Sequence, residues 1–200
     1  NSHSHSPSIA ILMGTYCGEK YLGEQLDSFL MQTFENWKLW ASDDGSFDST
    51  LNILKKYQDK CPSGKINIIS GPRKGFAENF LSMACRQEIK ADYYAFSDQD
   101  DIWNPEKLQR ALNFFSQVPS TVPGLYCTRT RLVDTYNHPI GFSEYFAKAP
   151  SFSNALMQSI GGGNTMVFNE AARKLLVKAG SGLNVVTHDW WLYLVVSGCG

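Results

Sequence analysis

Residues 34–46 read Phe34-Glu35-Asn36-Trp37-Lys38-Leu39-Trp40-Ala41-Ser42-Asp43-Asp44-Gly45-Ser46, an apolar run that ends in two carboxylates. Residues 93–101 have the same form: Tyr93-Tyr94-Ala95-Phe96-Ser97-Asp98-Gln99-Asp100-Asp101. Carboxylates directly after two strand-like runs predict two acidic clusters at one edge of a parallel sheet, which is the edge where open α/β sheets bind ligands. Bare carboxylates repel one another unless a cation or hydrogen-bond donors are present. The simplest occupant is a divalent metal ion that carries a phosphorylated ligand.

Strand-like runs alternate with helical spacing on both sides of these two stretches. Strands are expected at 9–13, 38–42, 65–70 and 93–97, and helices at 21–31, after Asp48-Ser49, from Phe76, and from Asn104-Pro105 to Phe115. This order predicts an α/β fold with a mostly parallel open sheet and helices on both faces. The second half is less regular. There we expect an extended segment at 125–133, a turn at 137–139, a short strand at 165–168, and helices at 170–179 and from Thr187 or His188 to Val196.

Length and composition predict one globular domain. The 200 residues are 43% apolar and 13% aromatic, which is enough to bury a sizeable core. Residues 9–200 are expected to form the domain, and it ends without a closing element, as a truncated domain would. Residues 1–8 alternate Ser and His and are expected to be a disordered terminus or a cloning remnant.

Charge and cysteine usage exclude several classes of protein. The net charge of −1 gives no electrostatic support for nucleic-acid binding. The five cysteines contain no C-x-x-C pair, which is typical of reduced thiols in a cytosolic protein. No apolar run approaches the roughly 20 residues of a membrane span.

Three strand ends predict one crevice. Thr15, Asp43 and Asp98 each lie at the carboxyl end of an expected parallel strand. The Asp43 carboxylate can accept a hydrogen bond from a base N–H or from a ribose hydroxyl, and the Tyr16 ring offers a flat face on which a base can stack. Asp98 can hold the ribose. Asp100 suits Mg²⁺ or Mn²⁺, because hard cations prefer oxygen ligands.

Each of these assignments has a structural alternative. Asp-Gly-Ser is an ordinary turn sequence, so Asp43 and Asp44 are as well explained by a turn as by a ligand. The cluster at Asp98 favours ligand binding, because adjacent carboxylates are costly without counter-charge. Asp189 lies near the start of the helix expected from Thr187 or His188. Without further information it would be explained as a favourable charge in the first turn of that helix.

At this point a family resemblance is visible. It rests on Gly14-Thr15-Tyr16-Cys17-Gly18-Glu19-Lys20-Tyr21-Leu22, Gln25-Leu26-Asp27-Ser28, Gln32-Thr33, Asp43-Asp44-Gly45-Ser46-Phe47-Asp48-Ser49-Thr50 and Ser97-Asp98-Gln99-Asp100-Asp101-Ile102-Trp103. In this order and spacing the chain resembles the family 2 inverting glycosyltransferases, which have the glycosyltransferase-A fold. The last segment resembles their D-x-D element. The later pieces are most similar to bacterial rhamnosyltransferase-like members.

The resemblance implies roles for the matching donor-site residues. Thr15, Tyr16 and Asp43 would hold the nucleoside, with Asp44 beside them in the substrate site. Asp98 would contact the ribose and diphosphate. Asp100 would be the ligand of Mn²⁺ or Mg²⁺.

The resemblance also implies an acceptor side. Asp189 maps to the general base, the second member of the family's Glu-Asp pair, and His188 replaces the Glu. An Arg that the family often carries is replaced by Glu78, and Arg73 or Lys74 would have to substitute for it. Trp190 is a candidate for acceptor contact, although core packing is the default for a tryptophan. Gly161-Gly162-Gly163 is explained equally well by a close acceptor approach and by a tight connection.

The function expected on this basis is inverting sugar transfer. The donor would be a UDP- or dTDP-linked sugar, and the acceptor a glycan or a lipid-linked hydroxyl in bacterial surface-polysaccharide synthesis. The enzyme would be cytoplasmic, with peripheral association at the inner face of the membrane. The alternatives are a sugar nucleotidyltransferase, which should carry a denser Gly-rich basic loop after the first strand, and a non-catalytic nucleotide-sugar-binding module, which would not need Asp189.

Overall fold

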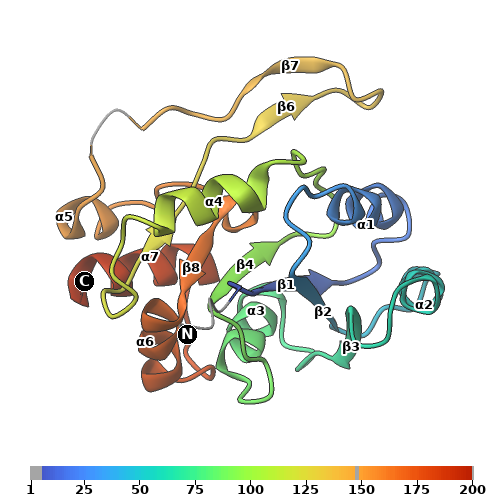
Figure 1. Ribbon diagram of the computed structural model, residues 1–200, viewed down its shortest axis with the longest axis horizontal. Coiled ribbons are helices and arrows are strands. Elements are labelled where there is room, and N and C mark those ends of the chain that lie inside the picture. The colour runs from blue at the N-terminus through green and yellow to red at the C-terminus, as the bar shows by residue number, and fades with distance from the viewer. Residues whose placement is uncertain (1–5, 147–148, 200) are drawn as a thin grey trace, which may run out of the picture.

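The computed structural model describes residues 6–146 and 149–199 (Figure 1). The first half alternates strands and helices: β1 (Ile9–Thr15), α1 (Leu22–Leu30), β2 (Trp37–Asp43), α2 (Thr50–Lys60), β3 (Ile66–Ser70), α3 (Phe76–Cys85), β4 (Tyr93–Ser97) and α4 (Lys107–Phe115). The second half contains β5 (Leu125–Tyr126), β6 (Arg131–Val133), β7 (Pro139–Phe142), α5 (Phe152–Ala155), the 3-10 turn η1 (Gly163–Thr165), β8 (Val167–Asn169), α6 (Glu170–Ala179) and α7 (His188–Cys199). The expected alternation in the first half is confirmed.

The main sheet has six strands in the order β3-β2-β1-β4-β8-β5. The pairs β1–β2, β2–β3 and β1–β4 are parallel, whereas β8 runs antiparallel to both β4 and β5. The expected mostly parallel sheet is therefore confirmed. The chain moves outward from β1 to β2 and β3 and then returns to place β4 on the other side of β1. The strand order reverses there, and open α/β sheets bind ligands at such a switch point.

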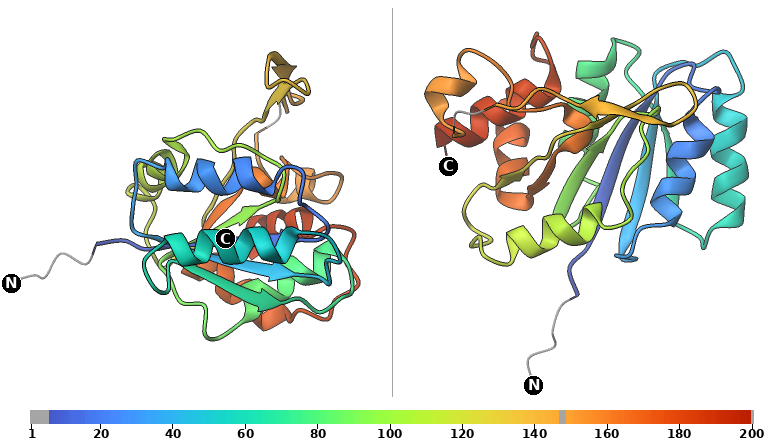
Figure 2. Two further views of the ribbon diagram at one scale, coloured as in Figure 1. Left: turned by 90° about the vertical axis from the view of Figure 1, so that its right-hand side faces the viewer. Right: turned by 90° about the horizontal axis from the view of Figure 1, so that it is seen from above.

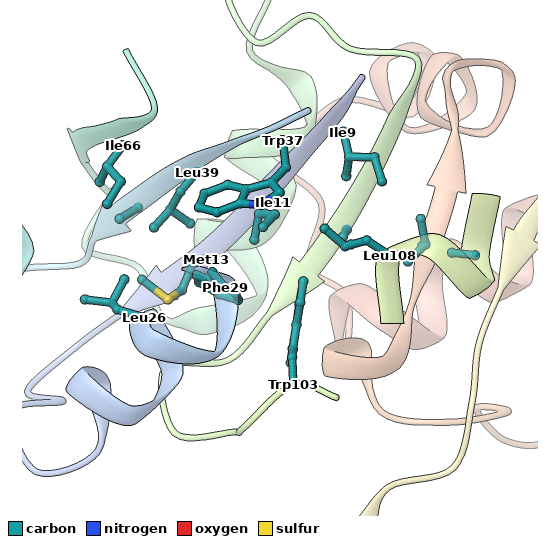
Figure 3. Close-up of a cluster of buried hydrophobic side chains, with 14 of the residues drawn as sticks. Ile9, Ile11, Met13, Leu26, Phe29, Trp37, Leu39, Ile66, Trp103 and Leu108 are labelled. Carbon is teal, nitrogen blue, oxygen red and sulfur yellow. The ribbon is translucent and has the colours of Figure 1, made fainter. Parts of the chain in front are cut away.

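Helices cover both faces of the sheet (Figure 2). Alternate side chains of each strand point to opposite faces, so β1 sends Ile9, Ile11 and Met13 to one core and Ala10 and Leu12 to the other. The first core packs against α1, α2 and α4 and includes Phe29, Trp37 and Trp103 (Figure 3). The second core packs against α3, α6 and α7 and is rich in aromatic rings, among them Phe80, Tyr94, Phe96 and Phe168.

The segment expected to be extended at 125–133 contains two short strands that belong to different sheets. Leu125–Tyr126 pairs with β8 in the main sheet, whereas Arg131–Val133 pairs with β7 in a separate two-stranded sheet. The residues of β6 are all exposed, so they bury no apolar side chain that would favour pairing with the main sheet. The turn expected at 137–139 lies earlier, because the Asn137 N–H donates to the Asp134 carbonyl at 3.0 Å and Pro139 already begins β7. Asn137 has a φ of 64°, a left-handed conformation that Asn tolerates. In Figure 1 this hairpin projects from the body of the molecule.

Two boundaries also differ from expectation. The strand expected at 165–168 begins at Val167 and ends at Asn169, because Gly163–Thr165 first forms the 3-10 turn. Part of the stretch 1–8, expected to be a disordered terminus or a cloning remnant, is hydrogen-bonded to the domain. The Ser8 N–H and hydroxyl donate to Asp92 at 2.8 and 2.7 Å, and Asn36 donates to the Pro7 carbonyl at 2.7 Å. Residues 1–5 lie outside the described residues.

Candidate functional site

The carboxyl ends of β1, β2 and β4 bring the predicted residues to one edge of the sheet. Thr15 and Asp43 are register partners at the last rungs of β1 and β2. The β1–β4 ladder ends at Met13 and Ser97, so Asp98 begins the loop beside the same edge. The expected gathering of Thr15, Asp43 and Asp98 is therefore present.

The Asp43 carboxylate is buried and already well supplied with donors. Oδ1 accepts the backbone N–H groups of Gly45 and Ser46 at 3.1 and 2.9 Å. Oδ2 accepts the hydroxyls of Thr15 and Ser46 at 3.0 and 2.5 Å. The turn interpretation of Asp-Gly-Ser is thus correct for the backbone, and Gly45 has a φ of 104° that only glycine adopts without strain. A ligand N–H that reaches Asp43 must replace one of the two hydroxyls, because the turn fixes the backbone donors.

Asp44 ties the end of β2 to the loop that follows β3. Its Oδ1 accepts the Arg73 N–H at 2.6 Å, and its Oδ2 accepts the Gly75 N–H at 3.0 Å. Both oxygens are therefore used to hold the loop before α3. Arg73, one of the two cations expected to replace the missing family arginine, lies against Gly45, while Lys74 pairs with Glu78 at 3.3 Å.

The Tyr16 ring is available to a ligand. It is 55% exposed and meets the edge of Phe47, itself 85% exposed, at a centroid distance of 6.3 Å. Two exposed aromatic rings beside the carboxyl ends of β1 and β2 offer flat apolar faces of the kind that nucleobases stack on. Sequence reasoning missed Phe47. Its position directly after the Asp-Gly-Ser turn was visible, but its contact with Tyr16 was not.

The Asp98 carboxylate begins the acidic loop after β4 and lies among other carboxylates. Burial, followed by the nearby carboxylates of Asp101, Asp100 and Asp189, raises the pKa of Asp98 to about 7. Asp100 is exposed at the tip of the loop. Because Asp189 acts on Asp98, the start of α7 and the loop after β4 face the same space.

Asp101 is a member of this cluster that sequence reasoning did not assign. Its Oδ2 is buried and has no hydrogen-bond partner among the described residues. Burial raises the pKa of Asp101, and hydrogen bonding from Asn164 and the charge of Lys107 oppose that effect. The Lys107 ammonium donates to the Asn164 carbonyl at 2.8 Å, and burial lowers the pKa of Lys107 to about 8.

The carboxylate of Asp189 is oriented by two backbone N–H groups. Oδ2 accepts from Gly163 at 2.9 Å, and Oδ1 accepts from Trp190 at 2.7 Å. Gly163 must lack a side chain, because a Cβ there would lie 2.5 Å from His188 Nε2 and 3.3 Å from Asp189 Cβ. The Gly-rich segment therefore forms a tight connection that also holds Asp189.

His188 is a buried aromatic ring. It stacks on Phe80 at a centroid distance of 3.9 Å and meets the edge of Phe96 at 4.8 Å. Neither ring nitrogen has a hydrogen-bond partner in the described part of the chain. Burial lowers the pKa of His188 to about 4, although the Asp189 charge opposes this, so the ring is neutral at pH 7. These contacts favour a structural role over that of a metal ligand.

The tryptophans near the site are anchored by the protein. The Trp190 indole N–H donates to the Ala155 carbonyl at 2.6 Å and joins α7 to α5. Trp103 is 4% exposed and packs on Phe29 at 4.7 Å, so core packing explains it.

The chemistry of the cluster fits a divalent metal ion. Among residues 6–146 and 149–199, no group of three or more His, Cys, Asp or Glu side chains is already arranged to hold one. However, Asp98, Asp100 and Asp101 supply hard oxygen donors, and the buried Oδ2 of Asp101 has a free acceptor site. Burial and the neighbouring carboxylates raise the pKa of Asp98, and a bound cation would favour its charged form.

Known structures share this fold. S. aureus TarS 1-349 in complex with UDP-GlcNAc has a TM-score of 0.69 at 20% identity, over 95% of this chain and 53% of that one. A mannosyltransferase from Pyrobaculum calidifontis in complex with GDP-Man and Mn²⁺ has a TM-score of 0.67 at 18% identity, over 94% of this chain and 51% of that one. The architecture is that of nucleotide-sugar glycosyltransferases of the glycosyltransferase-A type.

Sequence comparison defines the family. Residues 10–176 match the model of glycosyl transferase family 2, so the chain belongs to that family. A relative from Shigella flexneri, dTDP-rhamnosyl transferase RfbG, is 32% identical over 191 residues, which cover 90% of this chain and 63% of the relative. The chain thus spans less than two thirds of that relative's length. Within the described residues, no helix is long and apolar enough to cross a membrane.

Proposed function

We propose that the chain transfers a sugar from a nucleotide-diphosphate sugar to an acceptor hydroxyl, with inversion at the anomeric carbon. The observation that carries this proposal is the convergence of carboxylates from two elements. Asp98, Asp100 and Asp101 follow β4, Asp189 begins α7, and the charge of Asp189 acts on Asp98. Membership of family 2 supports the same reaction class.

The donor nucleoside binds between the ends of β1 and β2. Tyr16, with Phe47 at its edge, stacks on the base, and Asp43 accepts the ring N–H of uracil or thymine in place of the Thr15 or Ser46 hydroxyl. Asp98 contacts the ribose and diphosphate side. Asp44 supports this site by holding the Arg73 loop beside it. The dTDP-rhamnosyl name of the Shigella relative favours a dTDP- or UDP-linked donor.

The diphosphate lies over the acidic loop after β4. Asp100, exposed at the tip of this loop, is the proposed ligand of Mn²⁺ or Mg²⁺, with Asp98 and Asp101 beside it. A divalent ion in this position neutralises the charge that develops on the departing diphosphate. Its hard-oxygen ligand set is the one that such ions prefer.

Asp189 takes the proton from the attacking acceptor hydroxyl. The N–H groups of Gly163 and Trp190 fix the orientation of its carboxylate and leave lone pairs free for the acceptor. A single displacement needs one base and no covalent nucleophile, and it inverts the anomeric centre. Trp190, whose N–H is used by Ala155, offers only its ring to an acceptor.

The acceptor is a glycan or a lipid-linked hydroxyl in bacterial surface-polysaccharide synthesis. We place the reaction in the cytoplasm, at the inner face of the membrane. All five cysteines are free, which supports a reducing compartment.

Product analysis after incubation with UDP- and dTDP-sugars, with and without Mn²⁺, tests the function. Release of nucleoside diphosphate that depends on Mn²⁺ supports sugar transfer. Exchange of pyrophosphate would instead support a nucleotidyltransferase, and binding without turnover a non-catalytic module.

A further inference from the structure

The side chain of Gln99 joins the two loops that border the switch point. Its Oε1 accepts the Tyr16 backbone N–H at 2.9 Å, and its Nε2 donates to the Tyr16 carbonyl at 3.0 Å. These paired bonds connect residues that are 83 positions apart in the chain. They also fix the amide orientation, because a flipped amide would set donor against donor and acceptor against acceptor.

The position of this pair follows from the sheet. The parallel ladder between β1 and β4 ends at Met13 and Ser97, whereas β1 stays paired with β2 as far as Thr15. The β1–β4 ladder contains no residue pair beyond Met13 and Ser97. The primary amide of Gln99 has the same donor and acceptor as a peptide group, so it acts as one more rung at Tyr16.

Gly18 packs against the same amide. A Cβ at Gly18 would lie 2.3 Å from Gln99 Oε1 and 2.5 Å from its Cδ. The backbone around Gly18 is fixed from the other side, since its N–H donates to Thr50 at 2.8 Å. Gly18 has ordinary backbone angles, so glycine is needed here for space and not for conformation. The amide of Gln99, which is partly exposed, thus contacts the loop after β1 at both Tyr16 and Gly18.

We propose that Gln99 is a positioning residue that fixes the separation between the Tyr16 loop and the Asp98–Asp101 loop. Its neighbours in the chain, Asp98 and Asp100, are the residues proposed for the diphosphate and its metal ion, and Tyr16 is proposed for the base. The two parts of a nucleoside diphosphate therefore bind at a distance set by one side chain. This inference rests on the proposed function.

Calorimetric titrations of the whole chain with two probes test it. Uracil, which has no ribose for Asp98 to contact, reports the Tyr16 side alone, whereas UDP with Mn²⁺ reports both loops together, and thymine and dTDP form the equivalent pair. Gln99→Met removes both hydrogen bonds and keeps an unbranched side chain of similar length. We expect affinity for UDP with Mn²⁺ to fall roughly tenfold and affinity for uracil to change less than about twofold. The ratio of the two affinities is the readout, because general loosening of the fold would weaken both probes.

Two further variants make the test specific. Gly18→Ala should reproduce the effect of Gln99→Met by pushing the intact amide away. Gly18→Ala is also combined with Gln99→Ala, in which the added methyl group has no amide to displace. Gly18→Ala should then cause no further loss of affinity for UDP with Mn²⁺, so the effects of the two substitutions should not add. Gln109→Met, which changes an exposed glutamine on α4, is the matched control and should leave both affinities unchanged.

An unchanged ratio of affinities in Gln99→Met would overturn the inference and leave the proposed function standing. Additive losses in the double variant would also overturn it. If the wild-type chain binds neither UDP nor dTDP with Mn²⁺, both the inference and the proposed function fail.

Discussion

Single residues at the edge of the sheet divide into those that hold the loops and those that are free to meet a ligand. Asp44 has both oxygens on the backbone of the Arg73 loop, whereas Asp100 is exposed. Asp189 is intermediate between Asp44 and Asp100. Two backbone N–H groups orient its carboxylate, and its oxygens keep lone pairs that can accept a hydrogen bond from a ligand. Carboxylates of equal charge thus serve different purposes according to how many donors each one already has.

The role of Asp189 is tested by Asp189→Asn, which keeps the shape and removes the basic oxygen. We predict that sugar transfer falls by roughly 10²–10⁴-fold while donor affinity is kept. Transfer is measured by product formation and donor affinity by calorimetry, on a chain long enough to transfer sugar. Asp48→Asn, at the start of α2, is the matched control and should transfer normally. Wild-type transfer by Asp189→Asn would mean that Asp189 only caps α7.

The burial of His188 predicts a pH dependence of stability. Its pKa in the folded chain, about 4, lies below the usual histidine value of 6.5, so the unfolded chain binds more protons between these two pH values. Stability is therefore lost as pH falls from about 6.5 toward 4. Between pH 7 and pH 5 we predict that wild type loses about 1–2 kcal/mol more than His188→Leu in denaturant unfolding.

Comparing the two chains cancels other titrating groups, including Asp98, which is present in both. Equal losses in wild type and His188→Leu would show that His188 does not stay neutral in the folded chain.

The sequence predicted the residues that lie at strand ends. Thr15, Asp43, Asp98 and Asp100 could be located because the end of each apolar run marks the edge of the sheet. The bonds of Gln99 to Tyr16 could not be predicted, because they join loops 83 residues apart and leave no local pattern.

At the scale of elements, the start of α7 is fixed by the 3-10 turn at Gly163–Thr165. Gly163→Ala would place a methyl group 2.5 Å from His188 Nε2, so the turn must shift and the N–H bond to Asp189 must lengthen. We predict that transfer falls at least about tenfold, since small displacements of a base are costly, with donor affinity unchanged.

Gly182→Ala is the matched control, because a Cβ at Gly182 meets nothing within 4 Å. Product formation and calorimetry on both variants check the prediction. Transfer by Gly163→Ala at the rate of Gly182→Ala would mean that the Gly163 bond does not position Asp189.

Elements with strong periodicity were predicted well, and weakly buried ones were not. Tyr93–Ser97 and Glu170–Ala179 have the expected bounds, because burial and period agree there. The segment 125–133 contains extended residues that belong to two different sheets. Sequence alone does not separate them, because strand pairing depends on which partner the chain meets later.

At the scale of the molecule, the sheet order brings four strand-to-loop junctions and the start of α7 to one side. In the proposed function, β1, β2 and β4 form the donor half of the site, and the turn at Gly163 and α7 form the acceptor half. The chain spans 63% of the length of the Shigella relative.

The most direct test of a metal-dependent nucleotide site is calorimetric titration of wild type and Asp100→Ala with UDP and dTDP, each with and without Mn²⁺. Asp100 is exposed at a loop tip, so the variant should melt at the wild-type temperature. We predict that wild type binds at least one of the two nucleotides in a Mn²⁺-dependent manner and that Asp100→Ala loses this dependence. Mn²⁺-dependent affinity that is the same in both chains would contradict the assignment of Asp100, and the absence of nucleotide binding by wild type would contradict the site itself.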